Sequence, residues 1–415
     1  MRRSTLNLLL ALLLWVLPAT MLACQQGSQA DGEQGSTSET AEAAKIPVTT
    51  TSEEARDLYL QGRTLAENLR AIDAQEPLQQ AVQKDPTFAS AYLLLANTSQ
   101  DNEGFFSNLE KAVANMGTAS EGERLQIQAV QAGVDGRADE QLALLKELVQ
   151  KFPEDERAHN ALGNQLFFAR QEYDAAIAEY QKAVEINPEY SASWNSMGYA
   201  ARAAGRFDEA ENAFRKYIEV LPGEPNPYDS YAEFLMKMGR HDESIAQYRK
   251  ALEVEPTFTA SDVGIIHNQM FMGQGDAARQ TADALFAKAA NDGIRRQALL
   301  WKAASYLYEG NQAKAMQILE ERRAISEKTN DWLAVSGDDV LIGQTLLDLG
   351  DPQKAAERFQ WSIDEVAKAD VPEGTKEATR RNHLFNEARV ALAKGDIALA
   401  KEKSAAYHTA VQTPA

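Results

Sequence analysis

Residues 191–224 read SASWNSMGYAARAAGRFDEAENAFRKYIEVLPGE, and residues 225–258 read PNPYDSYAEFLMKMGRHDESIAQYRKALEVEPTF. Both stretches are 34 residues long, and their aromatic, glycine and proline positions coincide: Trp194 with Tyr228, Gly205 with Gly239, Phe214 with Tyr248, and Pro222 with Pro256. Apolar residues recur every three to four positions on both sides of the central glycine, which predicts one helix before it and one after it. Each stretch is therefore predicted to be a pair of helices joined by a turn. A small residue, Gly198 or Ala232, lets the two helices approach closely.

These units resemble tetratricopeptide repeats, in which large, small, aromatic and proline residues recur in a fixed order over 34 residues. Residues 159–188 form a third clear copy, with Leu162-Gly163 and Tyr180 in order and one extra residue before Tyr173. Weaker copies follow the same pattern in residues 55–88, 89–122 and 123–155. The resemblance implies an all-α fold, a right-handed α-solenoid of about ten helix pairs between Ser52 and the C-terminus.

The glycines that separate paired helices become more widely spaced towards the C-terminus. The separations are 34, 34, 37, 40 and 45 residues in the series Gly205, Gly239, Gly273, Gly310, Gly350 and Gly395. The later units are therefore predicted to have longer helices or loops. We divide the chain into a signal peptide, a disordered tether, tetratricopeptide repeats, and divergent helical repeats with a C-terminal cap: residues 1–23, 24–52, 53–293 and 294–415. The tether is assigned because residues 25–52 contain no aromatic residue and are rich in small and polar ones.

Cys24 is the only cysteine in 415 residues, and it follows a segment with the layout of an export signal. Arg2 and Arg3 precede the apolar run LLLALLLWVL, and small residues lead up to Ala23. The residues Met21-Leu22-Ala23-Cys24 resemble the lipobox of bacterial lipoproteins, which implies cleavage after Ala23 and attachment of lipid to Cys24. Ordinary signal-peptidase cleavage, which leaves a free thiol, is the alternative. A single cysteine also rules out an intramolecular disulfide.

The position after the cysteine and the net charge bear on localisation and partners. By resemblance to enterobacterial lipoproteins, Gln25 in place of Asp implies transport to the outer membrane, with the protein facing the periplasm. The chain carries a formal net charge of −19, which becomes −21 when Arg2 and Arg3 leave with the signal. A chain this acidic repels phosphate backbones, so we expect no nucleic-acid partner. Membrane attachment then depends on the lipid at Cys24.

No pattern of residues indicates catalysis, a metal or a cofactor. The five histidines are too far apart in sequence to form a helical two-histidine metal motif. The glycines in residues 272–276 fit the turn between paired helices, and no phosphate-binding loop or nucleophile elbow occurs in the sequence. Acidic pairs such as Asp338-Asp339 and Glu320-Glu321 are interpreted as solvated helix faces of an acidic chain. We therefore predict a protein that is not an enzyme and that binds no cofactor.

The remaining candidate for function is the inner surface of the repeats. In this repeat family the first helix of each pair lines a concave groove, and the spacing places three residues of each first helix on that face. We call the nine predicted residues the ladder: Asn160, Asn164, Phe168, Asn195, Tyr199, Arg202, Asp229, Glu233 and Lys237. Amides can pair with an extended peptide backbone, rings add contact area, and basic groups can hold a carboxylate. The alternative is that these side chains are merely solvated.

Two classes of function remain open. The first is an interaction scaffold that is anchored on the extracytoplasmic side of a bacterial membrane and binds a protein or peptide in the groove. The second is a solute-, peptide- or glycan-binding lipoprotein, with Trp301, Trp332 and Trp361 of the divergent repeats as an alternative site. Binding of a chaperone C-terminus is not expected. Family members with that activity place Lys or Arg where this chain has Asn160, Asn226 and Ser230.

Overall fold

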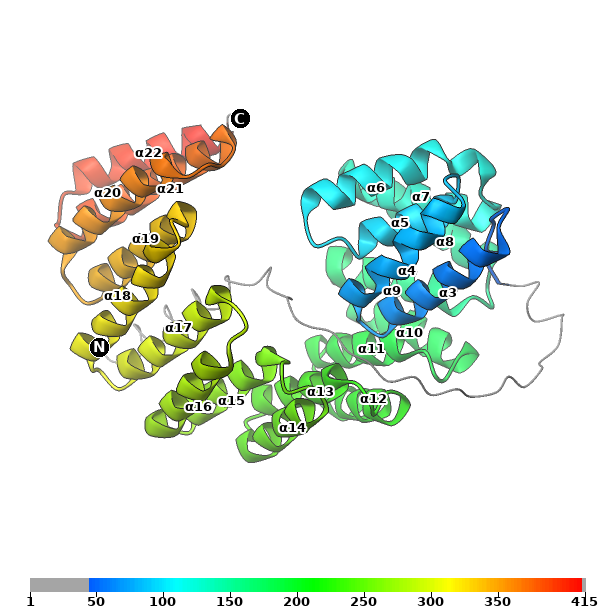
Figure 1. The fold of residues 1–415 in the computed structure, drawn as a ribbon, viewed down its shortest axis with the longest axis horizontal. Helices are drawn as coiled ribbons and strands as arrows, with labels where there is room; N and C mark the ends of the chain where they lie inside the picture. Colours follow the sequence, from blue (N-terminus) through cyan, green and yellow to red (C-terminus); the bar gives the residue numbers. More distant parts are fainter. Residues whose placement is uncertain (1–44, 413–415) are drawn as a thin grey trace. The chain divides into compact units, whose positions relative to one another are not determined.

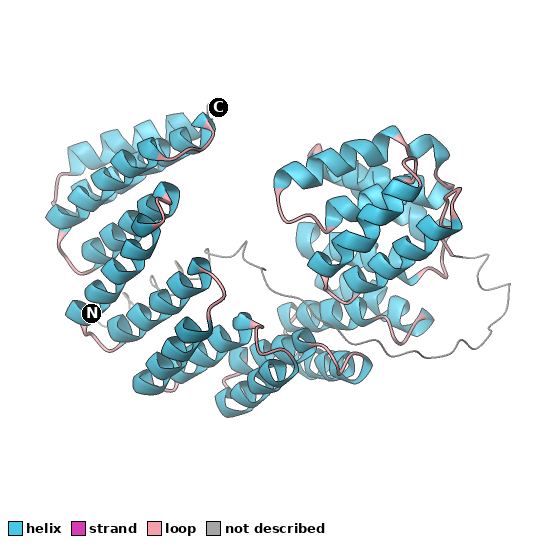
Figure 2. Ribbon diagram, viewed as in Figure 1, coloured by secondary structure: helices cyan, strands magenta, loops and turns pink. Residues whose placement is uncertain are grey.

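The computed structural model describes residues 45–412, and Figure 1 follows the chain through them. The predicted cleavage and lipidation residues, Ala23 and Cys24, lie outside the described residues. Helices and loops make up the whole described part, which contains no strand (Figure 2). Twenty α-helices, α3 to α22, form ten successive pairs. The predicted all-α solenoid and its number of repeats are confirmed.

The N-terminal unit, residues 45–256, contains six pairs. They are α3 (Glu53–Glu67) with α4 (Ala71–Lys84), α5 (Ala89–Asn97) with α6 (Asn102–Ala114), α7 (Glu121–Val134) with α8 (Ala138–Lys151), α9 (Glu156–Asn164) with α10 (Tyr173–Ile186), α11 (Ser191–Ala203) with α12 (Phe207–Val220), and α13 (Pro225–Lys237) with α14 (His241–Val254). A short 3-10 turn, η1 (Met116–Thr118), precedes α7, and a π-helical turn, η2 (Gln165–Arg170), extends α9.

The C-terminal unit, residues 257–412, contains four pairs. They are α15 (Thr259–Phe271) with α16 (Gly275–Lys288), α17 (Asp292–Tyr308) with α18 (Gln312–Lys328), α19 (Trp332–Asp348) with α20 (Pro352–Lys368), and α21 (Glu373–Ala393) with α22 (Ile397–Gln412). The compact units thus divide between Pro256 and Thr257. Helix length changes later. The helices α17 to α20 have 17 residues each, whereas α10 to α16 have 13 or 14.

The turn between paired helices requires a left-handed backbone, which glycine adopts without steric cost. All six glycines singled out in the sequence have φ between 72° and 84°, so the predicted turn positions are confirmed. Gln171 occupies the corresponding position of the third clear repeat, with φ of 56°. The extra residue of that repeat is absorbed just before this position, in the wide turn η2.

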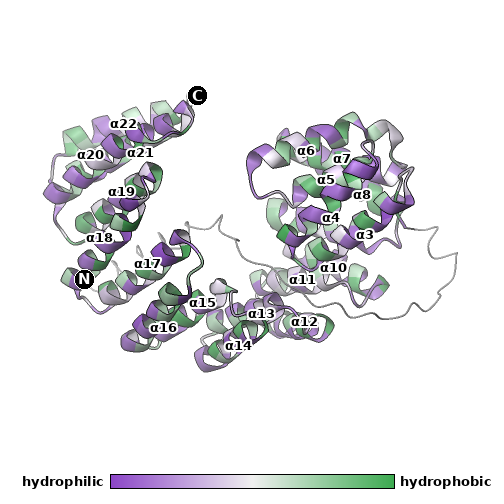
Figure 3. Ribbon diagram, in the orientation of Figure 1, coloured by the Kyte–Doolittle hydropathy of each residue, from purple (hydrophilic) through white to green (hydrophobic). Residues whose placement is uncertain are grey.

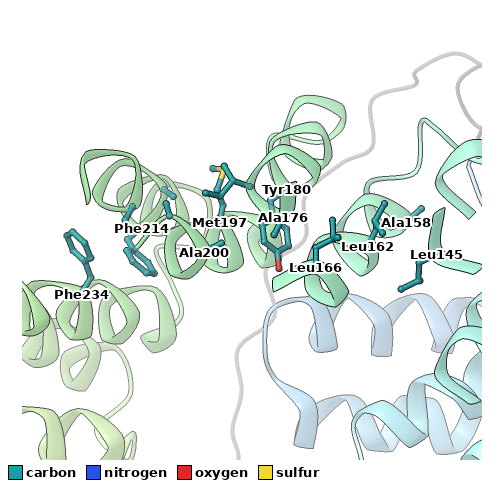
Figure 4. Close-up of a cluster of buried hydrophobic side chains, with 14 of the residues drawn as sticks. Leu145, Ala158, Leu162, Leu166, Ala176, Tyr180, Met197, Ala200, Phe214 and Phe234 are labelled. Atoms are coloured by element: carbon teal, nitrogen blue, oxygen red, sulfur yellow. The ribbon is translucent and has the colours of Figure 1, made fainter. Parts of the chain in front are cut away.

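The helices α3 to α21 each bury side chains, so that apolar and polar residues alternate along the same helices (Figure 3). The largest cluster of buried side chains in the N-terminal unit runs through consecutive pairs, including Leu162, Tyr180, Met197 and Phe214 (Figure 4). Paired helices approach closely where the first helix has a glycine: a Cβ atom on Gly198 would lie 2.7 Å from the Phe214 ring. Gly163 faces Tyr180 and Gly343 faces Phe359 in the same way. The predicted role of the small residue therefore recurs in both units.

The end of the predicted tether differs from the expectation of disorder. Residues 45–51, which we call the strap, form neither helix nor strand and lie against the N-terminal unit. Ile46 packs on the cluster of Figure 4, and Val48 packs on a separate cluster around Phe88. The next residue, Ser52, caps α3 by accepting a hydrogen bond from the Ala55 amide at 3.2 Å. The β-branched residues Ile46 and Val48 supply the apolar contacts of the strap.

The acidic pair of α19 is buried, which corrects its interpretation as a solvated face. Asp338 is 1% exposed and Asp339 is 0% exposed. Burial is possible because arginines from neighbouring helices supply countercharge. Arg296 lies 3.1 Å from Asp338, which also pairs with Arg322. Arg323 and Arg358 lie 3.0 Å and 2.9 Å from Asp339, respectively.

Among residues 45–412, every helix falls short of the length and apolar character that a bilayer span requires.

Candidate peptide-binding surface

The ladder lies on the first helices of three consecutive pairs, α9, α11 and α13, and on the turn η2 that extends α9. Its first residue links two of these helices, because the Ser193 hydroxyl of α11 donates to Asn160 Oδ1 at 2.9 Å. Asn164 is engaged within its own repeat and accepts a hydrogen bond from the Tyr180 hydroxyl at 2.8 Å. These two asparagines therefore already contribute an acceptor to the fold, which leaves their amide nitrogens as the groups that could meet a ligand.

Three further ladder residues form one polar cluster between α11 and α13. Glu233 accepts from the Tyr199 hydroxyl at 3.0 Å and from Arg202 Nη1 at 2.8 Å. The Arg202 guanidinium lies 5.1 Å from the centre of the Tyr199 ring, which itself packs edge-on against Phe214. Burial and the neighbouring Glu233 carboxylate raise the pKa of Tyr199, so its hydroxyl stays protonated and donates.

The cluster changes what these residues can do. Arg202 was expected to hold a ligand carboxylate, yet the carboxylate it holds is that of Glu233. A ligand would have to compete for this guanidinium. Tyr199 carries part of the packing against Phe214, so removing its ring would disturb the repeat as well as the surface. The cluster therefore serves first as a link between repeats.

The other ladder residues are more open. Phe168 is 72% exposed and lies on the wide turn η2, where its ring centre is 4.6 Å from that of Phe167. Lys237 is exposed at the end of α13. Asn195 Oδ1 is buried without a hydrogen-bond partner, and Asp229 is half-buried. A buried acceptor without a donor is costly, so a movement of Asn195 that brought this oxygen to a donor would gain free energy.

The turn between α3 and α4 covers one end of the ladder, which the sequence did not indicate. Arg157, at the start of α9, lies 2.6 Å from Glu67, and the Ser191 hydroxyl at the start of α11 donates to Asn68 Oδ1 at 3.1 Å. Arg70 lies 3.3 Å from Glu224, the residue before α13. The beginnings of all three first helices are thus in contact with residues 67–70. The accessible part of the ladder is at the helix ends, around Phe168 and Lys237.

A second surface with binding character lies in the C-terminal unit. A cavity of about 350 Å³ opens between α19 and α21, with Leu333, Val340 and Phe385 as apolar lining and Gln344, Asn382 and Asn386 as amide lining. No charged residue lines it. The alternative site around three tryptophans is not formed as one surface. Trp301 is buried, Trp361 is 45% exposed, and none of the three, Trp332 included, lines this cavity.

Over residues 45–412, no group of three or more His, Cys, Asp or Glu side chains is arranged to hold a metal ion. The most buried histidine, His159, has both ring nitrogens engaged, by Glu179 Oε2 at 2.6 Å and by the Pro153 carbonyl at 3.0 Å. Its contacts are those of a structural residue.

Comparison with protein-family models identifies repeats in the middle of the chain. A model described as TPR repeat matches residues 165–205, and a model described as tetratricopeptide repeat matches residues 191–222 and 226–258. The second model thus matches nearly all of the two 34-residue stretches 191–224 and 225–258. No curated protein matches the chain.

Solved structures resemble the chain at low identity. A tetratricopeptide repeat protein from Parabacteroides merdae is 16% identical, with a TM-score of 0.38 over 66% of this chain and 94% of that one. YrrB, described as a TPR protein with an unusual peptide-binding site, is 18% identical, with a TM-score of 0.33 over 44% of this chain and 92% of that one. MamA is 22% identical, with a TM-score of 0.29 over 47% of this chain and 94% of that one.

Proposed function

We propose, from the premise that this chain contains tetratricopeptide repeats, that it is a scaffold which binds extended segments of other proteins and catalyses no reaction. The repeat fold is generally one of protein interaction. The observation that carries the proposal is the accessible end of the ladder, where Phe168 and Lys237 are exposed. On the repeat between them, in the first half of α11, Asn195 Oδ1 is buried without a hydrogen-bond partner. An extended chain could contact one of these groups per repeat. The polar cluster around Glu233 holds the helices that carry them in fixed register.

The proposed scaffold is attached to a membrane by lipid on Cys24. The support is the signal-like segment and the lipobox resemblance of Met21-Leu22-Ala23-Cys24. Gln25 supports the outer membrane as the final location, with the repeats in the periplasm. Attachment near the N-terminus would keep the repeats within reach of partners at that membrane.

Cys24→Ser should block maturation or move the protein from the membrane fraction to the soluble fraction, because the thiol is the only group that the lipid could modify. The measurement is cell fractionation with immunoblotting, together with the intact mass of the mature protein. An equal distribution of wild type and variant between the two fractions would exclude the anchor while leaving the scaffold proposal intact.

The triple variant Phe168→Ala, Asn195→Ala and Lys237→Ala should lower the affinity for a captured partner about tenfold or more, which corresponds to about 1.4 kcal/mol. The melting temperature should stay close to that of wild type, because Phe168 and Lys237 are exposed and Asn195 Oδ1 makes no hydrogen bond. Partners are first captured from solubilised membranes with the mature protein, and their affinity is then measured by calorimetry.

The matched control for this variant is Asn212→Ala with Lys250→Ala, two exposed positions on the second helices α12 and α14. The control should bind as wild type does. Undiminished binding by a correctly folded triple variant would move the site away from the ladder.

The alternative function, a solute-, peptide- or glycan-binding lipoprotein, has one observation in its favour. The cavity between α19 and α21 is uncharged in an otherwise acidic chain, and it combines amide groups with apolar side chains. A neutral ligand would match that lining. This alternative function would be favoured if Phe385→Ala abolished capture of the partner while the ladder triple variant still captured it.

A further inference from the structure

The strap is bound across three consecutive helix pairs by four buried carboxylates. Asp85 precedes α5, Glu123 lies in the first turn of α7, and Asp155 and Glu156 lie at the start of α9. Their exposed fractions are only 2% to 4%. The strap residues above them are half-exposed or exposed. The arrangement is that of an extended peptide lying on a preformed surface, which we call the carboxylate edge.

Besides the apolar contacts of Ile46 and Val48 and two hydrogen bonds that the Pro47 and Val48 carbonyls accept, the strap pairs its own donors with carboxylates of the edge. Lys45 Nζ lies 2.7 Å from Glu156 Oε2, and the Ile46 amide donates to Asp155 Oδ2 at 3.0 Å. The Thr49 amide donates to Glu123 Oε1 at 3.0 Å. The Thr50 hydroxyl and the Thr51 amide both donate to Asp85 Oδ2, at 2.6 Å and 3.0 Å. The strap thus runs against the order of the repeats, from α9 back to the start of α5.

The carboxylates are held in place by their own repeats and not by the strap. Asp85 Oδ1 accepts from the amide and the hydroxyl of Thr87, and Asp155 Oδ1 accepts from the amides of Arg157 and Ala158. In both residues the other oxygen is the one that the strap uses.

The other two carboxylates are fixed in a similar manner. Glu156 Oε1 pairs with Arg157 at 2.8 Å and accepts from Asn187 at 3.3 Å, while its Oε2 meets Lys45. Glu123 Oε2 accepts from the Ser120 amide, and its Oε1 is shared between the Ser90 hydroxyl and the strap. The acceptors are therefore oriented before any peptide arrives, which lowers the entropic cost of binding one.

The spacing of the edge matches an extended chain. Five residues separate Ile46 from Thr51, or about 17 Å of extended backbone at about 3.4 Å per residue. Two steps between neighbouring helices of about 8–10 Å each cover the same distance. Any extended segment with donors at these intervals and one basic side chain would fit. The partner chemistry is thus a Lys or Arg followed by main-chain amides and threonine-like hydroxyls.

We propose that the carboxylate edge is a recognition site for an extended, basic and hydroxyl-bearing segment of another protein, and that the strap occupies it until such a segment displaces it. Displacement leaves each carboxylate with the partners supplied by its own repeat, while the strap donors pass to water. This site is separate from the ladder, whose residues lie further along α9 and η2 and on α11 and α13. The buried negative charge favours a basic partner over an acidic one.

The test uses the full mature chain with a weakened strap, carrying Lys45→Glu and Thr50→Val. Lys45→Glu places a second carboxylate beside Glu156, which the first repels. Thr50→Val removes the hydroxyl that donates to Asp85. The probe is a fluorescein-labelled peptide with the sequence of residues 45–52, KIPVTTTS, followed by fluorescence anisotropy. It should bind the weakened chain at least about tenfold more tightly than wild type. In wild type the tethered strap competes at an effective concentration of the order of millimolar.

Two controls define the specificity. A peptide with Glu in place of its Lys should bind the weakened chain at least about tenfold less tightly than KIPVTTTS does. Added salt should lower the affinity of KIPVTTTS for the weakened chain, because it screens the attraction between the Lys and the carboxylates. The three ladder substitutions, Phe168→Ala, Asn195→Ala and Lys237→Ala, are then introduced into the weakened chain. They should leave its affinity for the peptide unchanged, which distinguishes the carboxylate edge from the ladder site of the proposed function. The weakened chain must first show the helix content and melting temperature of wild type. If such a chain binds no peptide, or binds the Glu peptide more tightly, the proposal is wrong.

Amide hydrogen exchange measures in the unmodified chain how readily the strap leaves the carboxylate edge. The amides of Ile46, Thr49 and Thr51 should exchange much faster than the amides of Ala200 and Ala201 in the core, because local opening of the strap precedes global unfolding. Exchange as slow as that of the core amides would mean that the strap never leaves the edge in the folded protein, and would overturn the proposal even if the weakened chain failed to fold.

Discussion

Asp339→Ala should lower the free energy of unfolding of the C-terminal unit by about 3–5 kcal/mol. Asp339 is completely buried and pairs with both Arg323 and Arg358, which are themselves only 13% and 17% exposed. Removing the carboxylate leaves two guanidinium groups in a poorly solvated position with like charges facing each other. The remaining acidic neighbours are Glu320, Glu327 and Glu365. They compensate only in part, because Glu320 and Glu327 lie near the surface and Glu365 is also paired with Lys368.

Denaturant unfolding followed by tryptophan fluorescence measures this effect, since three of the four tryptophans among the described residues, Trp301, Trp332 and Trp361, belong to the C-terminal unit. The fourth, Trp194, reports the N-terminal unit and is replaced by Phe in both variants and in the reference chain. The matched control is Asp370→Ala, an exposed aspartate of the same unit, which should change stability by no more than about 0.5 kcal/mol. Equal stability of the two variants would mean that Asp339 is solvated, as the sequence alone suggested.

Gly198→Leu should destabilise the N-terminal unit by about 1–3 kcal/mol. The Cβ atom alone would lie 2.7 Å from the Phe214 ring, closer than real contacts allow, and the ring cannot retreat because it is fully buried. The two helices of the repeat must therefore separate, which also loosens the contact between Tyr199 and Phe214. Thermal unfolding followed by circular dichroism reports the change.

Gly223→Leu is the control for this substitution. Gly223 lies in the exposed turn before α13, has no atoms within 4 Å of a Cβ position, and lacks a left-handed backbone. The same increase in side-chain volume should therefore be tolerated. If both substitutions were tolerated equally, the assignment of Gly198 to a close helix contact would be wrong.

The repeat pattern predicted the parts of the fold that depend on short-range sequence. Gly205 and its five counterparts marked the turns of the last six helix pairs, because a left-handed position next to a helical apolar stripe leaves a clear local signal. The pairing of Gly198 with Phe214 followed from the 34-residue register. The ladder helices were also placed correctly. Their mutual contacts were missed, since a pattern that assigns Tyr199 and Glu233 to one surface does not reveal that they bond to each other.

Contacts between distant segments left weaker signals. The strap differs from residues 25–44 in its residues Ile46, Pro47 and Val48, a short apolar sequence that is unusual for a disordered tether. Two features of the sequence indicated the burial of Asp338 and Asp339. Arg322 and Arg323 in the preceding helix could supply countercharge, and the residues around the two aspartates are otherwise largely apolar. The contact between Arg157 and Glu67 spans 90 residues and left no signal at all, because periodicity carries no information about which repeats curve back onto one another.

The wide turn η2 has a consequence for how such an array can change over evolutionary time. A one-residue insertion in the third clear repeat is held inside the end of α9, while Tyr173 and the repeats that follow keep their phase. An alignment gap at this point therefore belongs to a helix and not to a connecting loop. Single-residue insertions at the ends of first helices can accumulate independently in each repeat, so that individual repeats diverge in length while the lineage retains their stacking.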